Sequence, residues 1–319
     1  MKKSAVVSLV TIAAAIALPQ AAYAPPPPKT PQVVTGDATA IGQTTVTLNG
    51  TVNPRGTATT YEFDYGKTKS YGTSTAPVSA GSGTTAKSVS ATATGLEPGT
   101  TYHFRIEATN TSGTVRGHDA TFKTLPRLTA VAKPARLVFG SATTIGGQLL
   151  DEDHAGKTVE LQANPYPYKG FVAVTTTTTS STGSYAFPPV KPTRNTRYRT
   201  EVKDLSVKSA VLNVGVRIRL TRSANDATPA AGQTVAFSGF ACPAHVGDLV
   251  SLQRRTSTGG WATVNTTHLV QAAATPACAH RSRYQVSIHV LHNRTFRVVA
   301  AADADHLRGI SRSIAITVH

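Results

Sequence analysis

The feature that most constrains how this chain can fold is a phrase that occurs in it twice. Residues 154–162 read HAGKTVELQ, and residues 245–253, 91 positions later, read HVGDLVSLQ. His, Gly, Val, Leu and Gln recur, and Val and Leu stand two positions apart, which is the period of a β-strand that buries one face. A glycine just before such a strand is typical of a turn. The phrase therefore predicts two copies of one folding unit, each with a turn followed by a half-buried strand.

The similarity between the two copies continues outside this phrase. The matching segments are 146–147 with 238–239, 170–174 with 260–264, 184–187 with 283–286, and 195–199 with 293–297. The offset rises from 91 to 98 or 99, so the later copy contains an insertion of about nine residues near 272–281. Short strand-like segments about every 8–12 residues are typical of an immunoglobulin-like β-sandwich. The sequence therefore predicts one such sandwich at 126–215 and another at 216–319.

Residues 33–125 show the same strand period without belonging to the repeat. TYEFDYG at 60–66 places three aromatic rings on one face of a strand, and GLEPGTTY at 95–102 places a Pro-Gly turn before another strand. Together with an early strand around Leu48, these motifs resemble a fibronectin type III domain of exported bacterial proteins. The resemblance implies a β-sandwich in which Tyr102 fixes a crossing between the two sheets. The tryptophan common in an early strand of that family is absent here.

Residues 127–319 resemble a second group, the Ig-like and carboxypeptidase-regulatory-like modules repeated in exported proteins of high-GC bacteria. The shared motifs are Gly-x-x-Val-x-Leu-Gln, a Gly-aromatic hairpin and Asn-Thr-x-Tyr-Arg. The chain is also rich in Thr and Val, which suit the pleated surface of a sheet. The predicted fold class is therefore all-β, with three tandem Ig-like and fibronectin type III sandwiches after a signal peptide.

The first 24 residues predict that signal peptide. Two lysines precede an apolar run at 6–18, and AYA at 22–24 fits a small-x-small cleavage motif. The alternative is an uncleaved N-terminal anchor, and the proline at position 25 leaves the cut site open. Residues 25–32 predict a stiff Pro-rich linker. We expect the chain to be secreted or held at the cell surface, with no membrane span in the mature chain.

The chain has two cysteines, Cys242 and Cys278. An even count in an exported chain predicts a disulfide, while the alternative, a metal pair, lacks a nearby Cys-x-x-Cys or His-x-His partner. Cys242 follows the strand predicted at 234–240, and Cys278 lies in the insertion. The bond would close a loop of about 37 residues and pin the insertion to a strand end, which stabilises the fold by about 3–4 kcal/mol in the loop-entropy model.

Positive charge is concentrated toward the C-terminus. The whole chain carries 32 Lys and Arg against 16 Asp and Glu. Basic and acidic residues number 8 and 6 in 25–125, 11 and 6 in 126–215, and 11 and 4 in 216–319, where all 11 are arginine. Outside a cell, such a surface would attract wall polymers, acidic polysaccharides, lipid headgroups or stray nucleic acid in a salt-dependent way. The alternative is a solvated surface without a specific partner.

The candidate ligand-binding residues are aromatic and basic. Tyr166 and Tyr168 alternate with two prolines at a predicted hairpin tip, and Trp261 follows Arg254 and Arg255 in the later copy. Rigid aromatic side chains provide faces on which sugar rings stack. In the alternative interpretation, the rings at 171 and 261 are matched core residues and the two tyrosines only cap an edge.

No catalytic constellation is visible in the sequence. It contains no Gly-x-Ser-x-Gly, no His-Glu-x-x-His and no Gly-rich phosphate-binding loop of the form Gly-x-x-x-x-Gly-Lys-Ser/Thr. His154 and His245 are interpreted as local hydrogen-bonding residues of turns. The acidic stretch at 151–154 is interpreted as a solvated turn, with a calcium site built from its oxygen ligands as the alternative, and 303–306 is a weaker version of it. We therefore expect no catalytic residue, metal or cofactor.

These observations favour a non-catalytic, exported or cell-surface multidomain protein of structural or adhesion type, acting as a spacer or interaction scaffold. The alternative is a binder of anionic polysaccharide or cell-wall polymer through the basic C-terminal half. A third hypothesis, an enzyme or an enzyme's accessory protein, has no nucleophile and base to support it. Expected partners are an anionic wall polymer, a polysaccharide or another surface protein, with no specific nucleic acid.

Overall fold

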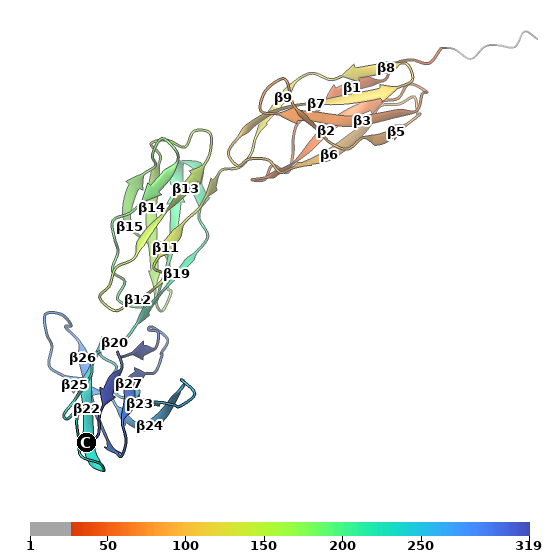
Figure 1. Cartoon of the computed structure of the whole chain (residues 1–319). Coiled ribbons are helices and arrows are strands. Elements are labelled where there is room, and N and C mark those ends of the chain that lie inside the picture. Colours follow the sequence, from red (N-terminus) through yellow and green to blue (C-terminus); the bar gives the residue numbers. More distant parts are fainter. Residues whose placement is uncertain (1–26) are drawn as a thin grey trace, which may run out of the picture.

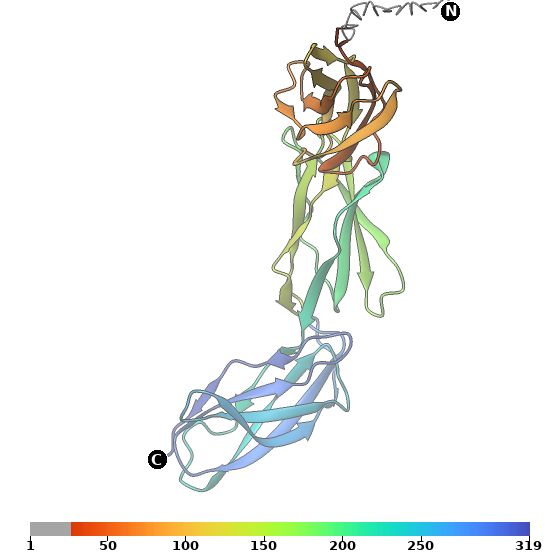
Figure 2. The ribbon, with the colours of Figure 1, turned by 90° about the vertical axis from the view of Figure 1, so that its right-hand side faces the viewer.

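The chain forms three β-sandwiches that follow one another end to end, as Figures 1 and 2 show from two directions. The structure, a computed structural model, describes residues 27–319, so the predicted signal peptide lies outside the described residues. Within this range the regular elements are β-strands, apart from one 3-10 turn, η1 (Lys203–Leu205). None of the helical structure in residues 27–319 is long and apolar enough to cross a membrane. The predicted all-β class and the three tandem sandwiches are confirmed, whereas the domain boundaries stay predictions.

The first sandwich consists of β1 (Gln32–Thr35), β2 (Thr45–Asn53), β3 (Thr59–Gly66), β4 (Thr73–Ser74), β5 (Val78–Gly81), β6 (Lys87–Thr94), β7 (Thr101–Asn110), β8 (Gly113–Arg116) and β9 (Ala120–Lys123). One sheet has the order β1-β2-β6, and the other has β4-β3-β7-β8, with β5 beside β3 and β9 beside β7. Buried residues alternate along β2 and β7, because successive strand residues point to opposite faces. The buried faces meet in a core that includes Leu48, Phe63 and Phe104.

Tyr102 ties the turn before β7 to the first sandwich. Its hydroxyl accepts a hydrogen bond from the backbone N–H of Glu97 at 3.0 Å. Its ring stacks on Phe122, with 5.6 Å between ring centroids and 12° between planes. This is the position and the backbone contact that the fibronectin type III resemblance implies for Tyr102.

The second sandwich consists of β10 (Arg127–Leu128), β11 (Val131–Lys133), β12 (Arg136–Val138), β13 (Thr144–Leu150), β14 (Thr158–Pro165), β15 (Val172–Thr178), β16 (Ser184–Ala186), β17 (Thr196–Val202), β18 (Val207–Lys208) and β19 (Leu212–Arg217). One sheet has the order β10-β13-β11, with β16 beside β13. The other has β12-β19-β17-β14-β15, with β18 beside β17. β12 and β19 pair in parallel.

The third sandwich consists of β20 (Arg219–Leu220), β21 (Ser223–Ala224), β22 (Gln233–Cys242), β23 (Leu249–Arg255), β24 (Trp261–His268), β25 (Val270–Ala272), β26 (Arg281–Val290), β27 (Arg294–Ala300), β28 (Gly309–Ile310) and β29 (Ile314–Ile316). One sheet has the order β20-β22-β26-β25, with β21 beside β22, and the other has β24-β23-β27-β28, with β29 beside β27. Cys242 ends β22 and is bonded to Cys278 in the loop between β25 and β26. The predicted disulfide is confirmed.

The repeated phrase forms the same strand in both later sandwiches, β14 and β23. Its Val and Leu are fully buried in each copy. After the Leu, each strand has a register irregularity opposite its hairpin partner, between Leu161 and Gln162 and between Leu252 and Gln253. Such a bulge re-aims the next side chain. The recurring glutamine is therefore part of the architecture of the repeat.

Each of these glutamines holds an arginine over an aromatic ring. In the third sandwich, Arg297 Nε donates to Gln253 Oε1 at 2.9 Å, and the guanidinium carbon lies 4.2 Å from the centre of the Trp261 ring. In the second, Arg199 Nε donates to Gln162 Oε1 at 2.7 Å, and the guanidinium lies 4.2 Å from the Phe171 ring centre. Phe171 and Trp261 are thus matched, but they are half-buried under an arginine and lie outside the hydrophobic cores.

Candidate functional site

The junction between the first and second sandwiches contains direct side-chain contacts. Asp151, whose side chain is only 2% exposed, lies 3.2 Å from Lys123 Nζ. Glu152 accepts hydrogen bonds from the hydroxyl of Thr101 at 2.8 Å and from its backbone N–H at 3.1 Å. The backbone N–H of Glu152 also donates to the carbonyl of Gly99 at 2.9 Å. The solvated turn expected at 151–154 is therefore wrong for Asp151, which is buried against Lys123, whereas Glu152 stays exposed while it contacts the preceding sandwich.

This junction is expected to loosen in acid. The pKa of Glu152 lies below its ordinary value of 4.5 because the hydroxyl and the backbone N–H of Thr101 bond the carboxylate and Lys123 lies beside it. A lowered pKa means that the stabilisation is fully present above about pH 4.5 and is lost as the pH falls through the lower, folded-state value. Small-angle scattering between pH 7 and pH 3 should show a broader range of molecular dimensions at low pH. Glu152→Gln should already be loosened at pH 7 and lack that step, and identical profiles would contradict the contact.

The junction between the second and third sandwiches is formed by a loop that follows β27. The backbone N–H of Asn195 donates to the carbonyl of Asp305 at 2.7 Å, and the N–H of Leu307 donates to the carbonyl of Val216 at 2.7 Å. Thr193 accepts a hydrogen bond from the ring of His306, also at 2.7 Å. This loop of the third sandwich is therefore bonded to two parts of the second sandwich, residues 193–195 and β19.

The predicted tyrosine pair lies at a hairpin tip, between β14 and β15. The rings of Tyr166 and Tyr168 meet edge to face with centroids 5.6 Å apart, and the Arg197 guanidinium lies 4.1 Å from the centre of the Tyr168 ring. Both tyrosines are half-buried. Part of each aromatic face is thus occupied by neighbours within the second sandwich, which leaves less surface for a sugar ring than the sequence suggested.

The other predicted residues lie in the third sandwich and border a basic groove. Arg254 and Arg255, at the end of β23, line a groove of about 520 Å³ together with Arg294. Its remaining walls are formed by Thr256, Ser257, Asn293, Thr295 and residues 315–317. Trp261 lies opposite Arg255 in the strand register. The five predicted residues therefore form two separate surfaces, one in each of the later sandwiches.

Arginines of the third sandwich have no acidic partners within it or elsewhere in the described chain. None of the 11 arginines in 216–319 has its side-chain nitrogen within 4.0 Å of a carboxylate in residues 27–319. Burial and the neighbouring positive charge of Arg308 lower the pKa of the Arg297 guanidinium. The first two sandwiches instead pair several of their acids with Lys or Arg, as in Arg105–Asp64 and Lys203–Glu160. The third sandwich thus presents unneutralised positive charge, which favours anions.

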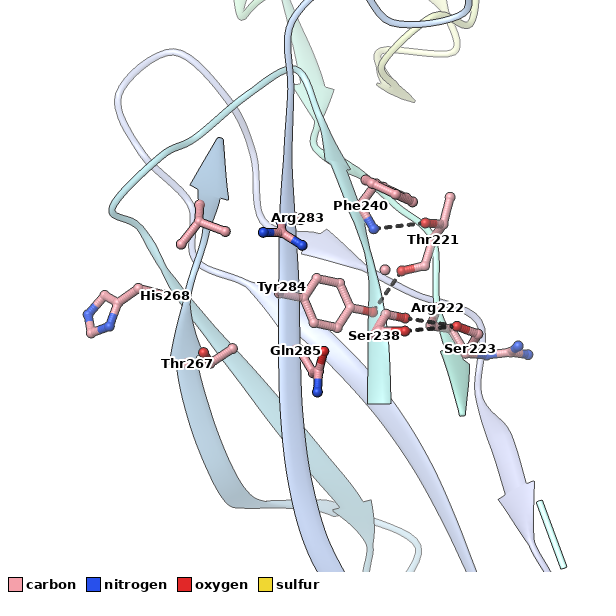
Figure 3. Close-up of a pocket in the computed structure, with 12 residues that line it drawn as sticks. Thr221, Arg222, Ser223, Ser238, Phe240, Thr267, His268, Arg283, Tyr284 and Gln285 are labelled. Carbon is pink, nitrogen blue, oxygen red and sulfur yellow. Dashed lines mark hydrogen bonds between the residues drawn. The ribbon is translucent and has the colours of Figure 1, made fainter. Parts of the chain in front are cut away.

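A larger hollow of about 720 Å³ lies on the other sheet of the third sandwich. Figure 3 shows the hydroxyl of Tyr284 pointing from β26 toward Thr221, to whose carbonyl it donates at 2.7 Å. Burial raises the pKa of Tyr284 well above its ordinary value of 10.0, so the hydroxyl stays protonated. Ser223 and Ser238 hydrogen bond to each other, while His268 projects away from them (Figure 3). The hollow therefore contains no paired nucleophile and base.

The two histidines of the repeated phrase have different surroundings. The His154 ring bonds the backbone carbonyls of Asp151 and Ser181, as expected for a local turn residue. For His245 that expectation is incomplete: its Nδ1 lies 3.3 Å from Asp248 Oδ2 in its own turn, but the ring is also buried against Asp303 and His306 from a loop more than 50 residues later. The only sign of this cluster in the sequence was the acidic stretch at 303–306. No residue near His245 in the sequence indicated that the two would meet.

Comparisons with known proteins leave the chain without an assigned family. No protein-family model matches it, and no curated protein matches it. Among solved structures, the sensor domain of the anti-sigma factor RsgI4 in Pseudobacteroides cellulosolvens is 23% identical over 30% of this chain and 76% of that chain, with a TM-score of 0.26.

Two multidomain structures match over a larger share of the chain. A tetra-tandem repeat in the extending region of a large adhesion protein is 17% identical over 90% of this chain and 74% of that chain, with a TM-score of 0.29. The FN1-FN3 domains of chicken CNTN1 are 17% identical over 92% and 100%, with a TM-score of 0.28. No functional assignment follows from similarities of this size.

Proposed function

We propose that this chain is a non-catalytic structural protein of adhesion type, exported or held at the cell surface, that acts as a spacer or interaction scaffold. The observation that carries the proposal is the construction of its junctions. Each sandwich contacts the next through hydrogen bonds at both junctions and through the Lys123–Asp151 ion pair at the first. Such contacts restrict how far neighbouring sandwiches can turn, which suits a chain that must hold its ends apart.

The disulfide supports export. Disulfides form and persist mainly in oxidising compartments outside the cytosol, and both cysteines of this chain are in the bond. The charged, apolar and small-residue pattern of residues 1–24 agrees with this location.

The experiment combines cell fractionation with scattering. The chain expressed from its native gene should appear in the culture medium or the cell-surface fraction, with its disulfide formed. In solution, small-angle scattering should give an elongated particle whose maximum dimension fits three sandwiches end to end. Recovery in the cytosol with two free thiols, or a collapsed particle, would contradict the proposal.

A second candidate function is binding of an anionic polysaccharide or cell-wall polymer through the third sandwich. Support comes from the groove of Arg254, Arg255 and Arg294, and from the lack of acidic partners for the arginines around it. A repeating polyanion could place successive charges against several guanidiniums, and such binding weakens as salt screens it.

Removing the three groove charges is expected to weaken polyanion binding. Exposed charge contacts are worth up to about 1 kcal/mol each, so Arg254→Gln/Arg255→Gln/Arg294→Gln should reduce affinity for dextran sulfate or purified wall polymer roughly tenfold to hundredfold at low salt. The triple variant Lys29→Gln/Arg55→Gln/Lys87→Gln removes the same charge from exposed positions of the linker and the first sandwich and should change affinity much less. Equal losses in both variants would show that only net charge matters, and no retention of the unmodified chain at any salt would exclude this function.

A further inference from the structure

Four side chains with metal-ligating atoms lie together where the third sandwich meets the second. They are His245, Asp303, Asp305 and His306, and one ligating atom of each lies within 4.8 Å of those of the others. The rings of His245 and His306 are 4.9 Å apart and perpendicular, at 89°. Both histidines are buried, at 9% and 3% exposure, while the two carboxylates reach the loop surface. This arrangement brings two imidazoles and two carboxylates into the space of one coordination sphere.

The orientation of His306 leaves a lone pair facing a carboxylate. Its Nε2 lies 2.7 Å from the carbonyl oxygen of Thr193, which can only accept a hydrogen bond, so Nε2 carries a proton. In the neutral ring, Nδ1 then has a lone pair, and it lies 2.8 Å from Asp305 Oδ1. Two acceptors at this distance need a cation or a second proton between them. Metal-bound histidines commonly donate their other N–H to a backbone carbonyl, as His306 does.

The ring of His245 supplies an independent observation. Its Nδ1 lies 2.6 Å from Asp303 Oδ2, while its Nε2 is buried and has no hydrogen-bond partner in the described part of the chain. A neutral ring therefore buries an unused lone pair, and a charged ring buries an unpaired N–H. Either state costs about 1–3 kcal/mol or more, so hydrogen bonds alone do not account for burying this ring in the cluster.

We propose that His245, Asp303, Asp305 and His306 form a binding site for one divalent transition-metal ion, for which Zn²⁺ is the natural probe. Imidazole nitrogen with carboxylate oxygen is a donor set that suits Zn²⁺ and its neighbours, whereas Ca²⁺ takes oxygen ligands only. Ligand atoms around a tetrahedral ion at about 2.1 Å lie about 3.4 Å apart. On binding, the His245–Asp303 and His306–Asp305 pairs, now 2.6 and 2.8 Å apart, would therefore open, while ligand atoms now up to 4.8 Å apart would move closer. The ion replaces any second proton on the histidines.

The site would act on the junction as well as on its own loop. Asp305 belongs to the cluster, and its backbone carbonyl accepts a hydrogen bond from the N–H of Asn195. Leu307 directly follows the cluster, and its N–H donates to the carbonyl of Val216. The ring of His306 is bonded to Thr193 of the second sandwich. A metal ion that fixes 303–306 would therefore also fix the surface on which the two sandwiches meet, and the orientation of the third sandwich would depend on metal supply.

The test uses the full chain without a polyhistidine tag, stripped with EDTA and dialysed. Titration calorimetry with Zn²⁺ should give one tight site per chain, and Co²⁺ should give a visible absorption band of nitrogen and oxygen ligation. Asp303→Asn and His306→Gln should each weaken Zn²⁺ binding at least about tenfold. His154→Gln, which alters the matching histidine of the preceding repeat, should leave binding unchanged.

Near-ultraviolet circular dichroism checks that each variant is folded. The Co²⁺ spectrum is measured on the unmodified chain, so it tests for the metal site even if the substitutions impair folding. Absence of a stoichiometric Zn²⁺ site and of the Co²⁺ band in the unmodified chain would overturn the proposal. Folded variants that bind Zn²⁺ as tightly as the unmodified chain would also overturn it.

Discussion

Gly239→Ala is expected to lower the free energy of unfolding of the third sandwich by about 2–4 kcal/mol. A Cβ at this position would overlap the backbone carbonyl of Thr221 and would lie 2.7 Å from the hydroxyl oxygen of Tyr284. The backbone at Thr221 cannot shift without a large cost in free energy, so the substitution would push β21 and β22 apart. It would also break the hydrogen bond from Tyr284 to Thr221, which leaves a buried hydroxyl unpaired.

The measurement can be confined to this sandwich because the chain has a single tryptophan, Trp261, in β24. Urea unfolding followed by tryptophan fluorescence should give a lower midpoint for Gly239→Ala. Gly260→Ala is the matched control, since its nearest atom is the flexible hydroxyl of Thr256 at 3.2 Å. An unchanged midpoint for Gly239→Ala would show that Tyr284 does not approach Thr221 closely across this glycine.

The second sandwich contains the same arrangement, a glycine packed between a backbone carbonyl and a tyrosine hydroxyl. A Cβ at Gly147 would overlap the carbonyl of Thr129 and would lie 2.8 Å from the hydroxyl oxygen of Tyr185, which also bonds Thr200. Gly147→Ala should therefore destabilise the second sandwich while moving the Trp261 transition much less. A loss confined to the substituted sandwich would also show that the two later units unfold independently.

Removing the disulfide is expected to have the largest effect of all on the third sandwich. Cys242→Ala/Cys278→Ala opens a covalent loop with a sequence separation of 36. The loop-entropy model then predicts a loss of about 3–4 kcal/mol, because the unfolded chain regains the freedom that the bond removed. Trp261 fluorescence in urea should again report the shift.

Reductant provides the control for this prediction. It should lower the unfolding midpoint of the unmodified chain toward that of the double variant, and it should have no effect on the variant itself. Alkylation followed by mass spectrometry should find no free thiol in the exported chain. A midpoint insensitive to reductant would mean that the bond does not constrain the unfolded state.

The fold was largely predictable because its signals are local. A strand with a period of two and a turn at glycine are properties of a few neighbouring residues, and the duplicated phrase marked the same strand in two sandwiches. Tyr102 could be assigned to its corner because the corner phrase is contiguous. The disulfide followed from counting, since two cysteines in an exported chain permit one pairing.

Other parts of the candidate sites could not be predicted. In the sequence, the recurring glutamine could not be told from any other strand residue. Its hydrogen bond to an arginine, Arg199 in the second sandwich and Arg297 in the third, depends on a bulge that the residues of the phrase do not predict. The acidic stretch at 151–154 looked solvated, because Lys123 and Thr101 belong to another sandwich. His245 was interpreted from its turn alone.

The sequence by itself determined that this chain is a row of β-sandwiches, where its repeat lies and which cysteines pair. These features follow from the alternation of buried and exposed residues along a strand, from the residue types at turns and from composition. All three are properties of the sequence itself. The tertiary structure alone decided how neighbouring sandwiches touch and why His245 and His154 differ. Those contacts join residues tens of positions apart, and their energies depend on burial and geometry that exist only once the sheets have packed.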